Sequence, residues 1–111
     1  MDRTEHFREL IKKSLQEIYE YLPEEEGIRN ELILDDINHH YELLQIGWEG
    51  PRRIHGSVVH CDIRDGKIYL EHNGTDFDIV EDWLDEGVKK SEIVLGSNPP
   101  YLRQHTKFAL A

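Results

Sequence analysis

Histidine and carboxylate side chains are the residues of this sequence with the widest capacity for chemistry. The chain of 111 residues holds seven histidines, one cysteine and 23 acidic residues. Zinc sites need three or four converging ligands, which usually stand at His-x-x-x-His or paired Cys-x-x-Cys spacing. Neither spacing occurs, and His39 and His40 are neighbours that would point to opposite faces of a strand. We therefore expect no metal site and no bound cofactor.

Two further patterns bear on catalysis. Asp62 and Glu71 fall on neighbouring predicted strands, as the acids of a cation-dependent nuclease do, but Asn73 stands where such a site needs a lysine. Cys61 lies on an apolar strand face, where a thiol is usually inert packing. The chain has neither a Gly-x-Ser-x-Gly motif nor a phosphate-binding loop. We expect no catalytic residues, and therefore no enzyme.

The stretch "GWEGPRRIHG", residues 47–56, combines an aromatic side chain with two guanidiniums. Aromatic rings stack on bases and arginines hold phosphates, so the stretch is compatible with nucleic-acid binding. It also has the chemistry of a hairpin loop, in which Trp48 would share a buried strand face with Leu44 and Ile46. Arg52 and Arg53 have no role in such a fold. We expect them to bind an external partner or, if a second helix crosses the hairpin, acids of residues 76–86.

Net charge weighs against strong nucleic-acid binding by this chain alone. The formal charge is −10, and binding to DNA depends on neutralising phosphates with basic side chains. The acids are concentrated in residues 20–36 and 76–86. These clusters predict either a solvated surface or a surface that binds a basic protein or mimics DNA.

Length and composition predict one small cytoplasmic domain. A chain of 111 residues can bury one modest core, and 38% of its residues are hydrophobic. No apolar run reaches the roughly 20 residues that a membrane span needs, and the N-terminus has no apolar signal region. The single cysteine excludes an internal disulfide, which fits a cytoplasmic protein.

Apolar spacing predicts a helix first and then a series of strands. Residues 2–22 carry apolar side chains at steps of three and four, with Asp2 or Thr4 as the cap and Pro23 ending the helix. Asp65-Gly66 is a strong hairpin signal. The other expected elements are strands at 31–36, 41–48, 52–63 and 67–72, a helix at 75–88 capped by Thr75, a turn at 89–96, a loop at 97–104, and an edge strand or short helix at 105–111.

The turn at 65–66 predicts the register of its two strands. Ile63 should face Ile68, Cys61 should face Leu70, and Val59 should face His72, on the core side. On the other side, the pairs should be Asp62 with Tyr69 and His60 with Glu71. The alternation changes face upstream, which predicts a bulge or bend near Gly56.

The whole chain resembles the XisI family. The resemblance rests on "HYELLQIGWEGPRRIHGSVVHCDIRDGKIYLEHNGT", "GVKKSEIVLG" and "RQHTKFALA", and most specifically on Gly47-Trp48, Arg52-Arg53, the "DGKI" turn, "VLG" and Phe108-Ala109. It implies one α+β domain over residues 1–111. In that domain a bent antiparallel sheet carries an N-terminal helix and a second helix packed on it.

The resemblance also implies a role in programmed DNA rearrangement. XisI proteins are described as controlling factors for excision of the fdxN element in cyanobacteria, during heterocyst differentiation. They are accessory to a site-specific recombinase and act alongside a nuclease-related XisH-like partner. We therefore expect a non-catalytic factor that acts through protein contact, with weak DNA binding on its own, and a homodimer is compatible with the sequence.

Two alternatives stay open. In the first, the chain is a recombination directionality factor that contacts DNA directly. In the second, it is a partner or inhibitor of a nuclease-like protein unrelated to excision. The charge placement separates the DNA-binding alternative from the others, because a DNA face should gather the basic residues. The candidate interface residues are Trp48, Arg52, Arg53, Arg103 and Lys107.

Overall fold

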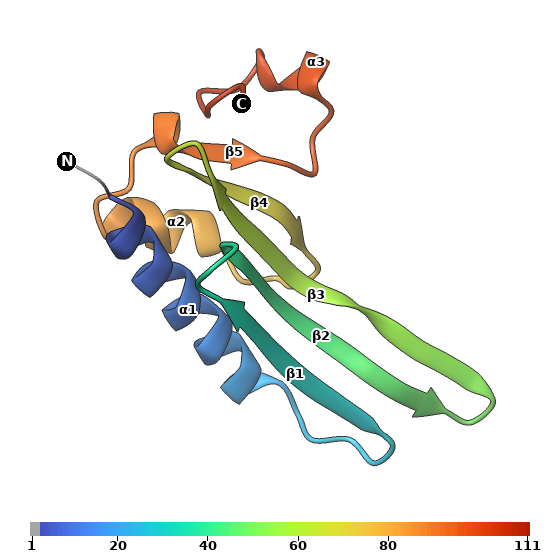
Figure 1. Ribbon diagram of the computed structural model, residues 1–111. Helices are drawn as coiled ribbons and strands as arrows, with labels where there is room; N and C mark the ends of the chain where they lie inside the picture. Colours follow the sequence, from blue (N-terminus) through green and yellow to red (C-terminus); the bar gives the residue numbers. More distant parts are fainter. Residues whose placement is uncertain (1–2) are drawn as a thin grey trace.

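A five-stranded sheet with helices packed on it forms the protein (Figure 1). The computed structural model describes residues 3–111. The elements, in chain order, are α1 (Thr4–Tyr21), β1 (Ile28–Asp35), β2 (His40–Glu49), β3 (Arg52–Arg64), β4 (Lys67–Asn73), α2 (Ile79–Asp85), the 3-10 helix η1 (Lys90–Glu92), β5 (Ile93–Leu95) and α3 (Pro100–Arg103).

The strands lie side by side in the order β1-β2-β3-β4-β5. The first four pair antiparallel in succession, and β5 pairs parallel to β4. The prediction of a single α+β domain is thus confirmed, but the sheet is mixed. Residues 89–96, expected as a turn, supply both η1 and β5. The chain returns through α2 between β4 and β5, which is the crossover that a parallel pair requires.

Helix α1 packs its apolar stripe on the sheet and supplies much of the core. Leu22 is extended, so the helix ends where Pro23 predicts. Its start differs from expectation, because Arg3 occupies the cap position without a side-chain cap and Thr4 is already helical. Asp2 lies outside the described residues. The main core cluster, drawn from α1, the sheet, α2 and the turn after it, consists of Phe7, Leu10, Ile11, Leu15, Ile18, Tyr41, Leu43, Val59, Cys61, Ile63, Ile68, Leu70, Ile79, Trp83, Val88 and Ile93.

Helix α2 is shorter than the sequence predicts. Asp78, not Thr75, caps it, because the Asp78 carboxylate accepts a hydrogen bond from the Glu81 amide at 3.1 Å. Thr75 instead donates its hydroxyl to Asn73 at 2.7 Å, within the turn that follows β4. The helix lies beside α1, where the indole of Trp83 donates to the Ser14 hydroxyl at 3.1 Å.

The β3–β4 hairpin confirms the predicted turn and part of the predicted register. Asp65 and Gly66 have φ of 52° and 73°, as the primed two-residue turns favour. The pairs of Ile63 with Ile68, Cys61 with Leu70 and Asp62 with Tyr69 are present.

Beyond Cys61 the register of this hairpin changes. Glu71 is an extra residue in β4, so His60 faces His72 and Val59 faces Asn73. The predicted pairs of Val59 with His72 and of His60 with Glu71 are therefore wrong. A second bulge, at Val58 in β3, lies two residues from the predicted position at Gly56.

The C-terminal segment folds against β5. Residues 97–104, expected as a loop, contain the short helix α3. Residues 105–111 are neither strand nor helix, although the Ala109 amide donates to the Ile93 carbonyl at 2.8 Å. No helix within residues 3–111 has the length and apolar character needed to cross a bilayer.

Candidate functional site

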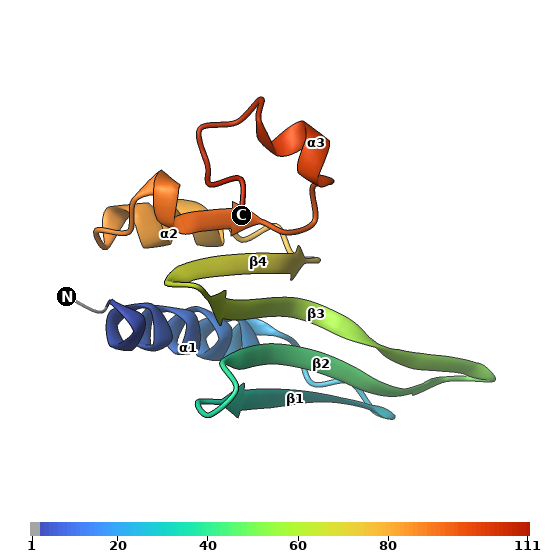
Figure 2. The same cartoon turned by 45° about the horizontal axis from the view of Figure 1, so that its top comes forward.

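The side of β1–β3 that faces away from α1, here called the open face, carries the candidate site. Tyr41 and Leu43 point into the core, so the alternate residues of β2 and their partners point the other way. Helices α1 and α2 lie on the opposite side (Figures 1 and 2). The open face consists of Arg29, Glu31, Ile33 and Asp35 from β1, His40, Glu42, Leu44, Ile46 and Trp48 from β2, and Arg53, His55, Ser57, His60 and Asp62 from β3.

Trp48 lies on this face near the tip of the β2–β3 hairpin. The residue is 54% exposed, so the prediction that it belongs to the core is wrong. The alternation with Leu44 and Ile46 is as predicted, but those residues share the open face rather than the buried one. The guanidinium of Arg53 lies over the Trp48 ring, 5.2 Å from its centroid. The pair forms a cation–π contact that is open to solvent.

The two adjacent arginines have few internal contacts. Arg53 donates to the Gly47 carbonyl at 3.3 Å, and Arg52 has a 72% exposed side chain that lies 3.6 Å from Glu49. Helix α2 lies beside α1, away from the hairpin tip (Figure 1). Among the ion pairs of residues 3–111, neither arginine meets an acid of residues 76–86. The alternative prediction, that acids of residues 76–86 bind these arginines, is therefore wrong.

Arg103 and Lys107 do not join this group. They belong to the C-terminal segment with α3, which lies far from the hairpin tip in both views (Figures 1 and 2). The Arg103 guanidinium donates to the Asn98 carbonyl at 3.0 Å and to the Leu110 carbonyl at 3.1 Å. Arg103 thus holds its own segment together, while Lys107 is exposed. The five candidate residues divide into Trp48, Arg52 and Arg53 at the tip and two residues elsewhere.

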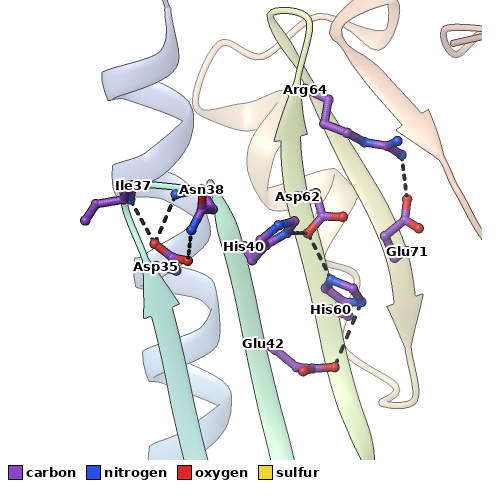
Figure 3. A network of polar contacts seen from close by, with 9 residues as sticks. All are labelled: Asp35, Ile37, Asn38, His40, Glu42, His60, Asp62, Arg64 and Glu71. Carbon is purple, nitrogen blue, oxygen red and sulfur yellow. Dashed lines mark hydrogen bonds and ion pairs between the residues drawn. The ribbon is translucent and has the colours of Figure 1, made fainter.

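A histidine–carboxylate cluster on the open face was not expected from the sequence (Figure 3). Asp62 Oδ1 lies 2.8 Å from His40 Nδ1 and 2.9 Å from His60 Nε2. On the far side of His60, Nδ1 faces the Glu42 carboxylate at 3.9 Å. Spacing along the chain does not reveal this group, because His40 comes from β2, whereas His60 and Asp62 come from β3. The cluster could have been found only from the register of β2 against β3, which pairs His40 with Asp62 and Glu42 with His60.

Local structure positions the cluster on both strands. Asp35 Oδ1 accepts hydrogen bonds from the amides of Ile37 and Asn38, which shapes the β1–β2 turn just before His40. These bonds, above all from Asn38, lower the pKa of Asp35. On the β4 side of the cluster, Arg64 lies over the Tyr69 ring and pairs with the Glu71 carboxylate at 3.5 Å.

Burial and charge distinguish the members of the cluster. The Asp62 side chain is only 10% exposed, whereas that of His40 is 55% exposed. The hydrogen bond to the Asp62 carboxylate raises the pKa of His40. The cluster therefore places a buried carboxylate at the base of two more accessible imidazoles.

A shallow groove of about 730 Å³ opens where the end of α1 meets β3 and the turn after β4. Tyr21, Leu22, Val58 and Phe77 supply apolar walls. The rings of Tyr21 and Phe77 meet edge to face, 5.1 Å apart.

Cys61 stands apart from these surfaces. It is 1% exposed in the core, and burial raises the pKa of its thiol. A thiol in this environment is packing rather than a nucleophile, as its position on the apolar strand face predicts.

Comparison with known proteins identifies the family. The family model described as XisI protein matches residues 1–110. This chain belongs to the XisI family. Among curated proteins, none matches it. Similar solved structures share the fold of this XisI-family chain over nearly its full length.

One of these is the crystal structure of a XisI-like protein from Anabaena variabilis. It is 38% identical, with a TM-score of 0.92, and the match covers 97% of this chain and 99% of that one. Another is the crystal structure of the fdxN element excision controlling factor XisI from Anabaena variabilis. It is 33% identical, with a TM-score of 0.87, and the match covers 99% of this chain and all of that one.

Proposed function

We propose that this XisI-family chain is a cytoplasmic, non-catalytic controlling factor for excision of a DNA element, acting through contact with a XisH-like protein. Its similarity to the fdxN element excision controlling factor of Anabaena variabilis supports the role in excision control. The observation that carries the proposed mode of action is the exposed Trp48–Arg53 pair at the tip of a projecting hairpin.

The hairpin tip suits a protein partner. Trp and Arg are the residues that most often dominate the binding energy of protein interfaces. Trp48 offers an apolar ring that is more than half exposed even with Arg53 over it, and the nearby Arg52 offers a guanidinium that can bind a carboxylate bidentately. A partner with an acidic group next to an apolar pocket matches this chemistry.

The arrangement of charge favours protein contact over direct DNA binding. A directionality factor needs several basic side chains on one face, but Arg52 and Arg53 lie far from α3 and Lys107. The formal charge of −10 opposes counterion release on DNA. We expect the purified chain to bind duplex DNA no more tightly than about micromolar at physiological salt.

Capture of a purified XisH-like protein tests the proposal. We expect the double variant Arg52→Ser with Arg53→Ser to lose capture by at least about 10-fold, as hot-spot residues do, while its melting temperature stays near that of the unaltered chain. The matched control, Lys13→Ser with Lys89→Ser, removes the same charge from exposed positions elsewhere and should capture normally.

Two outcomes would contradict the proposed mode of action. If the double variant binds its partner normally, the hairpin tip is not the interface. If the unaltered chain instead binds the recombination site tightly and sequence-specifically by itself, the directionality factor is the better description. An excision assay in a host that carries the element then measures whether loss of capture also abolishes excision.

A further inference from the structure

The His40–His60–Asp62 cluster has the donor set of a transition-metal site. Its three ligand atoms lie within 4.8 Å of one another, and each comes from a different side chain. Two imidazoles and one carboxylate are the protein ligands of many three-ligand metal sites that keep a coordination position open. We propose that His40, His60 and Asp62 bind one divalent transition-metal ion of the zinc type, with an open position toward solvent.

The three donor atoms lie within 4.8 Å of one another, so metal binding requires the two imidazoles to move around Asp62. Donor atoms that each lie about 2.0–2.2 Å from a tetrahedral ion are about 3.3–3.6 Å apart. The two nitrogens now lie 2.8 and 2.9 Å from Asp62 Oδ1, so they must move outward by several tenths of an ångström. His40 and His60 have side chains that are 55% and 32% exposed, which leaves room for this movement. The buried Asp62 can stay in place.

Surrounding side chains also suit a metal ligand set. Ligating histidines usually direct their second ring nitrogen at a carboxylate or carbonyl, which sets the tautomer and the ring orientation. His60 has this arrangement, because its Nδ1 faces Glu42 while its Nε2 faces Asp62. Figure 3 shows the resulting row of Glu42, His60, Asp62 and His40 across two strands.

The charges around the cluster also favour a bound dication. Asp62 and Glu42 together bring two negative charges to a surface where the two imidazoles are neutral when they ligate, and a dication would neutralise them. Arg64, the nearby cation, is engaged by Glu71 and by the ring of Tyr69. A bound ion would also tie β2 to β3 on the side of the sheet that no helix covers. This inference is independent of the proposed role in excision.

Metal titration of the full chain, produced without a polyhistidine tag, tests the site. We expect one equivalent of Zn²⁺ to bind by calorimetry and to raise the melting temperature, and Co²⁺ to give the visible absorption of a four- or five-coordinate ion. His60→Asn should lower the affinity by more than about 10-fold, and Glu42→Gln should lower it by about 10-fold.

His55→Asn is the matched control. His55 is an exposed imidazole on the same strand and the same face, opposite Ile46, and it lies outside the cluster. This variant should bind Zn²⁺ as the unaltered chain does. His40→Asn, at the exposed end of the cluster, serves as a second ligand variant that should fold even if the His60 variant does not. The proposal is overturned if Zn²⁺ fails to bind at one equivalent, or if the His40 and His60 variants bind as tightly as the His55 variant.

Discussion

The β2–β3 hairpin has a near half, which α1 covers, and a far half, which projects beyond α1. The side chains of the two halves differ in how far they are buried. Tyr41, Leu43 and Val59 are fully buried in the near half. Trp48 and Arg52, in the far half, have most of their side chains open to solvent. The same two strands run through both halves, so strand formation does not decide burial. Burial depends instead on whether α1 covers the strands.

The comparison also assigns different tasks to the two halves. In the near half, one side of each strand builds the core and the other carries the histidine–carboxylate cluster. In the far half, neither side lies against a helix, and an aromatic–guanidinium pair stays accessible. Stability therefore depends on the near half, whereas the far half can serve the proposed partner contact at little cost to the fold.

Neighbouring leucines on β2 provide the strongest test of this comparison. Leu43 points into the core and is 0% exposed, and Leu44 points to the open face and is half-buried. We expect Leu43→Ala to lower the free energy of unfolding by about 2–5 kcal/mol, because it leaves a cavity. Leu44→Ala should lower it by less than about 1.5 kcal/mol. Urea denaturation measures both, and equal losses would show that α1 does not divide the two faces.

A glycine pair probes the boundary between the halves. A Cβ on Gly47 would overlap the Gly27 carbonyl oxygen and approach Ile28 Cα to 2.8 Å, so the start of β1 would have to move. We expect Gly47→Ala to cost about 2 kcal/mol or more. At Gly56 in β3 a Cβ meets no atom within 4 Å, so Gly56→Ala should change the stability by at most about 0.5 kcal/mol. Thermal unfolding of both variants would contradict the comparison if Gly56→Ala were the more damaging.

Acid titration tests a charged link between α1 and the sheet near the covered half. Lys12 donates to Asp36 at 2.6 Å, which is the main reason that the pKa of Asp36 is lowered, and the Tyr41 hydroxyl adds a second bond at 3.0 Å. A carboxyl whose pKa is lower in the folded state contributes stability above its unfolded pKa and loses that contribution as the pH falls through the folded value. We expect stability to fall below about pH 4, with a shallower fall for Asp36→Asn. Identical pH profiles would show that this link contributes nothing.

Trp48→Ala should have the smallest effect on stability. An exposed cation–π pair contributes about 0.5–1 kcal/mol, and the ring fills no core position. Melting should therefore change little, whereas capture of the partner should drop together with that of the double arginine variant. A loss of several degrees with normal capture would assign Trp48 to the fold and not to an interface.

Local patterns in the sequence were sufficient for several elements. The apolar stripe of α1, its end before Pro23 and the turn at Asp65-Gly66 each depend on a few neighbouring residues, and each is confirmed. The pairing of Cys61 with Leu70 follows from that turn, because a two-residue loop sets the register beside it. The isolation of Arg52 and Arg53 from the core was also visible in the sequence.

Only the tertiary structure decided which strand face would be covered. Alternation correctly groups Trp48 with Leu44 and Ile46, but it cannot say on which side α1 packs, since both faces of β2 carry apolar residues. The bulges at Val58 and Glu71 likewise depend on pairing between strands, and the one at Glu71 pairs His60 with His72 instead of Glu71. His40 and Asp62 are 22 residues apart, and their meeting at 2.8 Å follows from the register of β2 against β3. Spacing along one strand cannot show a cluster that two strands build together.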